Sequence, residues 1–190
     1  MKQEDNQFLC DYEERLTHTL VRQLTDASLL EGELLAVEEL EQKWDSSAAE
    51  YMAAAVPQIN EYPAAAIAWA AYMGLGLSVL WDTAWEKFSD MEDLYTPIAA
   101  PRGFDEMDEY VVEEMLGYTL ESEEATKLEN AMRAAATTAL TMIRKESIEA
   151  QSVMAFYIFA RSAKVFFRVG VAVGLRLLGY RYHKSGVAVN

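Results

Sequence analysis

Apolar residues recur at spacings of three and four along most of the chain, which is the period of an amphipathic α-helix. No stretch alternates between apolar and polar residues with the period of a β-strand. The spacing predicts helices over residues 5–24, 28–56, 63–89, 105–117, 122–146 and 149–182. The predicted fold class is therefore all-α. We expect residues 1–190 to form a single-domain bundle of about six helices, for which antiparallel packing is the simplest arrangement.

Residues that begin or end helices set several of these boundaries. Ser28 followed by Glu31 has the capping-box pattern and predicts the start of the second helix. Pro63 stands where a proline of a first helical turn belongs and predicts the start of the third. Residues 90–104 contain two prolines and a glycine without any period, so they are predicted to form a long loop. The boundary between the last two helices falls within residues 144–152, where no glycine or proline marks it.

Two of the predicted helices are unusually apolar and carry small residues at regular spacing. Residues 64–81 contain no charge, and small side chains recur there and in the last helix (Ala66, Ala70, Gly74, Ser78; Ala163, Gly170, Gly174). Small residues at such spacing let two helix backbones approach closely, in membranes and in tightly packed soluble cores alike. We expect these two helices to form the buried centre of the bundle. A membrane-inserting bundle is a second alternative, which the cations of the last helix argue against.

Charge is divided unevenly along the chain, whose formal net charge is −15. The first 130 residues hold 7 Lys/Arg and 29 Asp/Glu, and the remaining residues hold 9 and 2. This balance excludes nucleic acid as an expected partner, because the phosphate backbone requires a basic surface. It favours a basic protein partner or a homo-oligomer. One cysteine and a polar N-terminus without an apolar core predict a cytoplasmic protein.

A basic stripe lies along one side of the last helix and consists of Arg161, Lys164, Arg168 and Arg176. The simpler interpretation is that the stripe faces solvent, while the opposite side of the helix packs in the core. The alternative is that part of it faces inward, where it forms ion pairs with carboxylates of the acidic two-thirds or lines an anion-binding cleft. In either case we expect its counter-charge to come from the protein's own acidic segment.

The predicted carboxylate partners of this stripe are Asp82 and Glu86, one helical turn apart and beside Trp81 and Trp85. Together these residues predict a ligand or ion-pair cleft between the third and sixth helices. The competing interpretation is that Asp82 and Glu86 mark the emergence of the third helix into solvent, and that the tryptophans belong to the core.

Motifs for enzymatic chemistry are scarce. Neither of the two histidines follows a glutamate at the spacing of carboxylate-bridged metal bundles, and no phosphate-binding glycine loop or nucleophile elbow is present. We therefore predict no catalytic residue, no metal site and no cofactor. The function predicted is a non-enzymatic binding or interaction protein. The alternative is a Mg²⁺- or Mn²⁺-dependent hydrolase or transferase that uses the acidic runs at residues 38–41 and 105–109.

Overall fold

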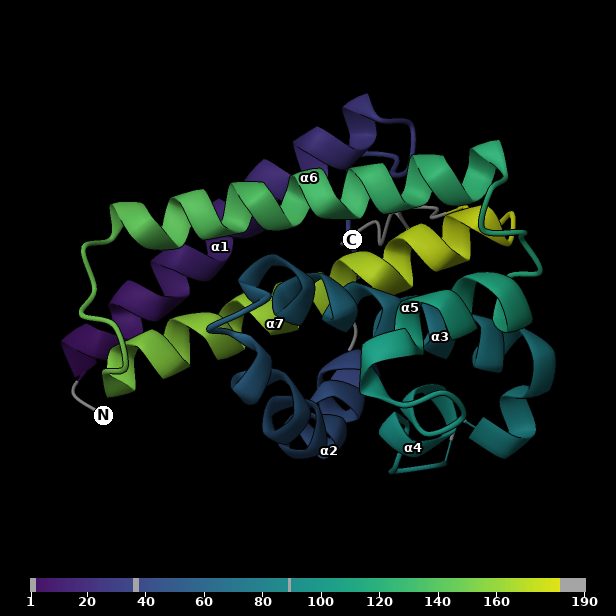
Figure 1. The fold of residues 1–190 in the computed structure, drawn as a ribbon, viewed down its shortest axis with the longest axis horizontal. Coiled ribbons are helices and arrows are strands. Elements are labelled where there is room, and N and C mark those ends of the chain that lie inside the picture. The colour runs from purple at the N-terminus through teal and green to yellow at the C-terminus, as the bar shows by residue number, and fades with distance from the viewer. Residues whose placement is uncertain (1–2, 36–37, 89, 182–190) are drawn as a thin grey trace, which may run out of the picture.

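The computed structural model describes residues 3–35, 38–88 and 90–181, and every regular element in these ranges is helical (Figure 1). This confirms the all-α fold class. The helices are α1 (Gln3–Asp26), α2 (Glu38–Ala55), α3 (Pro63–Phe88), α4 (Tyr95–Ala99), α5 (Met107–Tyr110), α6 (Glu123–Lys145) and α7 (Val153–Leu177). Two 3₁₀ turns (η1, Val56–Gln58; η2, Phe104–Glu106) and one π-helical turn (η3, Val111–Met115) complete the order.

The centre of the fold is the pair α3 and α7, as the small-residue spacing predicted. At three glycines of this pair the other helix leaves no room for a side chain. A Cβ at Gly74 would overlap the carbonyl of Phe167, one at Gly170 the carbonyl of Ala71, and one at Gly174 the hydroxyl of Ser78. The glycines therefore let the two backbones touch.

The contacts of this pair also give its direction. Ala71 meets Gly170, Gly74 meets Val171 and Ser78 meets Gly174, so residue numbers rise together along both helices. Helices α3 and α7 are therefore parallel, and the expected antiparallel arrangement is wrong for the central pair. The segment between them forms α4, α5 and α6. It brings the chain back to the end at which α3 starts, so that α7 begins there.

The other helices cover the pair on two sides. Helices α1 and α6 lie along one side, and α2 and α4 lie on the other (Figure 1). The hydroxyls of Tyr12 in α1 and Ser162 in α7 are 2.8 Å apart in a hydrogen bond. On the opposite side the Tyr51 hydroxyl of α2 donates to the carbonyl of Ala66 in α3. Each buried tyrosine thus satisfies its polar end within the core.

The predicted helix over residues 28–56 is wrong in its first part. Ser28 has a φ of 60°, and its amide donates to the carbonyl of Thr25, while the amides of Leu29 and Leu30 both donate to Leu24. This left-handed turn ends α1 and buries two leucines against it, as helix C-terminal motifs commonly do. Helix α2 begins at Glu38; residues 36–37 lie outside the described ranges.

Other boundaries shift for local reasons. The predicted loop 90–104 contains the short helix α4. Just before it, the Asp93 carboxylate accepts a hydrogen bond from the Thr96 amide at 3.0 Å, and hydrogen bonds from the side chain and the amide of Thr96 lower the pKa of Asp93. The start predicted for the last helix at residue 149 is also wrong. Ser152 caps α7, and Ser147 and Gln151, which precede this cap, have positive φ angles. That helix ends at Leu177, short of the predicted 182. Residues 89 and 182 lie outside the described part of the chain.

Candidate ligand-binding site

Three cations of the basic stripe of α7 meet two carboxylates, one from α1 and one from α2. A terminal nitrogen of Arg161 lies 2.6 Å from a Glu13 oxygen, and Lys164 pairs with Glu41. Arg168 lies between the two glutamates, 3.9 Å from Glu13 and 3.7 Å from Glu41. The side chains of Lys164 and Arg168 are about four-fifths buried. The stripe therefore faces inward and meets the acidic segment of the same chain, which is the alternative to a solvent-facing stripe.

Asp82 and Glu86 do not take part in this network. Asp82 accepts a hydrogen bond from the Tyr180 hydroxyl at 2.7 Å, and Glu86 is exposed. No ion pair of the described residues joins either carboxylate to Arg161, Lys164 or Arg168. The parallel register of α3 and α7 explains this, because it brings Asp82 beside Tyr180, more than two helical turns beyond Arg168.

The two tryptophans expected in the cleft stack edge to face at the end of α3, with ring centroids 5.7 Å apart. Between them the backbone of Ala84 leaves helical geometry, and Trp85 is 51 % exposed. The structure therefore separates the predicted site into a cation cluster in the middle of α7 and an aromatic pair at the end of α3. It does not bring the seven predicted residues together.

Glu13 gives a test of the cation cluster. Because Glu13 is the closest carboxylate to Arg161 and also faces Arg168, Glu13→Gln leaves two partly buried guanidinium groups short of negative charge. We expect a loss of about 1 kcal/mol of stability, between the values typical of exposed and of buried pairs. The melting temperature should fall by about 2–4 °C. Glu14→Gln, at the exposed neighbouring position, should leave it unchanged; equal melting curves for the two variants would contradict the proposed role of Glu13.

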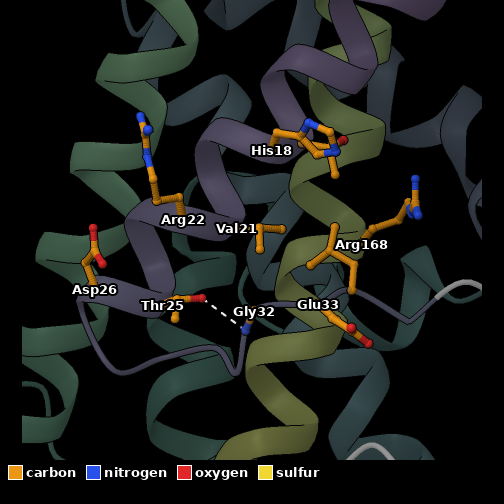
Figure 2. A pocket seen from close by; sticks show the side chains of 10 residues that line it. His18, Val21, Arg22, Thr25, Asp26, Gly32, Glu33 and Arg168 are labelled. Carbon is orange, nitrogen blue, oxygen red and sulfur yellow. Dashed lines mark hydrogen bonds between the residues drawn. The ribbon is translucent and has the colours of Figure 1, made fainter. Parts of the chain in front are cut away.

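A groove beside the cation cluster contains Arg168 and is lined mainly by α1 and residues 32–34 (Figure 2). Its volume is about 540 Å³. Figure 2 shows that the charged ends of Arg22, Asp26, Glu33 and Arg168 point in different directions. Cations and carboxylates alternate around it without converging on one point, so this groove does not define a ligand of one charge.

A different cavity combines aromatic side chains with several carboxylates. It lies between the first half of α3, α5 and α6, and its volume is about 420 Å³. Its lining comprises a face of α3 and of the turn before it (Glu61, Tyr62, Pro63, Ala64, Ala65, Ala68, Trp69, Tyr72), Asp108 of α5, and a face of α6 (Glu129, Met132, Arg133). Spacings of three and four place these residues on one side of each long helix. We call it the acid–aromatic cavity.

Asp108 is the most deeply placed carboxylate of this cavity. It accepts a hydrogen bond from the indole of Trp69 and has no ion pair with any cation of the described residues. Burial raises the pKa of Asp108 despite that hydrogen bond, and the nearby charge of Glu129 acts in the same direction. Arg133, the one cation of the lining, pairs with Glu129 on the surface of α6, where its side chain is 70 % exposed. The negative charge of Asp108 is therefore left without a counter-ion.

Tyr72 supplies a second polar group without a partner. Its side chain is only 4 % exposed and lines the cavity, yet its hydroxyl has no hydrogen-bond partner among the residues that the structure describes. Burial raises the pKa of Tyr72 well above its usual range, and the charges of Asp108 and Glu129 raise it further. Tyr72 and Asp108 thus bring a hydroxyl without a partner and a carboxylate without a counter-ion to the same cavity.

A smaller cavity of about 150 Å³ adjoins the first and shares Tyr72, Asp108 and Glu129 with it. Its remaining lining comes from Glu109, Val112, Leu120 and Ala125. Val112 belongs to η3, the π-helical turn that directly follows α5. Turns of this kind are rare and occur often at functional sites.

Sequence reasoning missed this site for identifiable reasons. Asp108 belongs to the acidic run 105–109, which the sequence suggested only as a metal site of the alternative function. Trp69 and Tyr72 lie in the uncharged segment 64–81, which was expected at the buried centre, and they are indeed buried, although both line the cavity. Only the fold brings Asp108 and Glu129 to this face of α3.

Two further observations bear on the alternatives. Within residues 3–35, 38–88 and 90–181, no three His, Cys, Asp or Glu side chains are grouped so that they could hold a metal ion. Helix α3 is long and apolar enough to cross a membrane by length and composition, but 83 % of its apolar window is buried inside the structure, as in the core helix of a soluble protein.

Comparison of the chain with protein-family models, with curated proteins and with solved structures finds no match in any of the three.

Proposed function

We propose that this protein is a binding protein for organic ammonium cations, which it takes into the acid–aromatic cavity. One observation carries the proposal. Asp108 is a largely buried carboxylate without a cationic partner, and it faces the same cavity as the unpaired hydroxyl of Tyr72. Isolated buried charge is costly, so such a group is retained where a partner of opposite charge completes it.

The lining matches an ammonium group on an apolar chain. An ammonium nitrogen can donate to the Asp108 carboxylate and to the Tyr72 hydroxyl, and charge-assisted hydrogen bonds are the strong ones. Ala65, Ala68 and Met132 provide an apolar wall for the methylene groups. An anion finds the opposite environment, because three carboxylates and one guanidinium line the cavity.

The cation can belong to a small molecule or to the basic protein partner that the acidic composition favours. Both present the same chemistry to Asp108. A metal-dependent hydrolase or transferase remains the alternative function, and stabilisation of the protein by millimolar Mg²⁺ or Mn²⁺ would favour it. Cytoplasmic localisation remains a prediction from the sequence.

Isothermal titration with three ligands of similar shape tests the proposal. We expect n-butylamine to bind with a Kd of about 0.1–1 mM, which is reasonable for a ligand of so few atoms. Butanol has the same shape without charge and butyrate carries the opposite charge, so neither should bind measurably. Equal heats for all three ligands, or no saturable heat with the amine, would overturn the proposal.

A further inference from the structure

We infer that the ligand is a linear diamine or longer polyamine, whose second ammonium group lies in the smaller cavity. This inference rests on the proposed function and adds the number and spacing of charges in the ligand. The two cavities share Tyr72, Asp108 and Glu129, so a ligand held at Asp108 borders both of them. A monoamine would occupy only one of them.

The smaller cavity has the chemistry that a second ammonium group requires. Beyond the shared wall its charged residue is Glu109, whose one ion pair is a long contact of 3.9 Å with Arg102. Arg102 lies closer to two other carboxylates, 2.7 Å from Glu113 and 3.2 Å from Glu114. One guanidinium thus serves three glutamates, and the region keeps an excess of negative charge. Glu109 is therefore available to a ligand cation.

The rest of the lining of the smaller cavity is apolar. Val112, Leu120 and Ala125 line the smaller cavity together with the carboxylates. Leu120 is 37 % exposed, although it is a large apolar side chain at a cavity wall. Methylene groups between two ammonium ions would cover these side chains and remove their surface from water. A lining of carboxylates and apolar side chains thus suits a chain that carries both ammonium and methylene groups.

Titration of three ligands into the protein and two variants tests this inference. Putrescine carries two ammonium groups, aminobutanol replaces one of them by a hydroxyl at nearly equal length, and n-butylamine lacks the second polar group. We expect putrescine to bind about fivefold more tightly than aminobutanol, which exceeds the statistical advantage of two equivalent ends and suits a half-exposed second charge. Glu109→Gln should abolish this preference and leave the affinity for n-butylamine unchanged. Glu106→Gln, at an exposed position outside both cavities, should preserve the preference.

The outcomes separate this inference from the proposed function. If all three amines bind with equal affinity, or if Glu109→Gln keeps the preference for putrescine, the second subsite is refuted while amine binding stands. If no amine binds, the proposed function itself fails. If a lysine-containing peptide binds with an unchanged Kd in Glu109→Gln and competes with n-butylamine, while putrescine shows no advantage, the ligand is a protein side chain and the diamine inference is overturned.

Discussion

Gly170→Ala is expected to destabilise the protein by roughly 3 kcal/mol, at the upper end of the usual cost of overpacking a core. The new methyl group would overlap the carbonyl of Ala71, which belongs to the backbone of the facing helix and has no rotamer by which to move away. The helices must then separate along their central contact. We expect the melting temperature to fall by about 6–12 °C, measured by circular dichroism at 222 nm.

Gly76→Ala is the matched control, since the same substitution is made in the helix that Gly170 contacts. The three atoms nearest its methyl group would be side-chain atoms of Ile98, the closest at 3.0 Å, and these can shift by a few tenths of an ångström. Alanine also favours a helix over glycine by about 0.8–1 kcal/mol, which offsets much of the crowding. We expect a melting temperature close to that of the wild type. Equal losses in the two variants would contradict the backbone contact between α3 and α7.

Asp108→Asn is expected to abolish amine binding and at the same time to stabilise the free protein at neutral pH. The amide keeps the shape of the side chain and can still accept from Trp69, but it carries no charge for the ligand to neutralise. Because removal of one partner of a buried charge pair costs several kcal/mol, the Kd for n-butylamine should rise at least about thirtyfold, beyond detection. Residues that serve binding at the expense of stability commonly show this combination of effects.

The gain in stability follows from the sign of the pKa shift. Burial raises the pKa of Asp108 in the folded protein above its ordinary value of 3.8. Between the two values the folded protein holds a proton that the unfolded chain has released, so the contribution of this group to stability falls as the pH rises through that window. The variant lacks this loss, and its melting temperature should exceed that of the wild type by a few degrees at pH 7 but not at pH 3.

Asp105→Asn provides the control for both readouts. Asp105 is exposed, lies one turn earlier in the same acidic run and lines neither cavity. It should bind n-butylamine as the wild type does and melt at the same temperature. A wild-type affinity in Asp108→Asn would place the amine elsewhere. A lower melting temperature at pH 7 would show that the ionised carboxylate stabilises the fold.

The centre of the fold could be predicted because its cause is local in sequence. Small residues every four positions in α3, and the pair Gly170 and Gly174, mark the faces that touch whatever the rest of the chain does. The division of charge also carried information across the chain, since Glu13 and Glu41 of the acidic segment pair with cations of the stripe of α7. In both cases the residue type alone indicates what must lie beside it, which is a closely packed helix for the small residues and an opposite charge for the cations.

The features that could not be predicted are the relative direction of the helices and the burial of single polar residues. Nothing in the sequence of α3 or α7 states that they are parallel, because the elements between them decide at which end α7 begins. The choice of Asp82 and Glu86 as partners therefore failed together with the expected antiparallel arrangement. Ser28 was misassigned because serine suits both a helix start and a left-handed turn. Asp108 resembles its exposed neighbours in sequence and differs from them only in its contact with Trp69.

The most direct test of the central claim is the pKa of Asp108, followed through its side-chain carboxyl carbon by NMR in the free protein and at saturating putrescine. We expect the free protein to show a pKa above the ordinary value of 3.8, because burial opposes ionisation. An ammonium group beside the carboxylate favours the charged form, so saturation should move the midpoint to lower pH. A midpoint that does not change when the ligand is bound would contradict the account, because the cation would then lie away from Asp108.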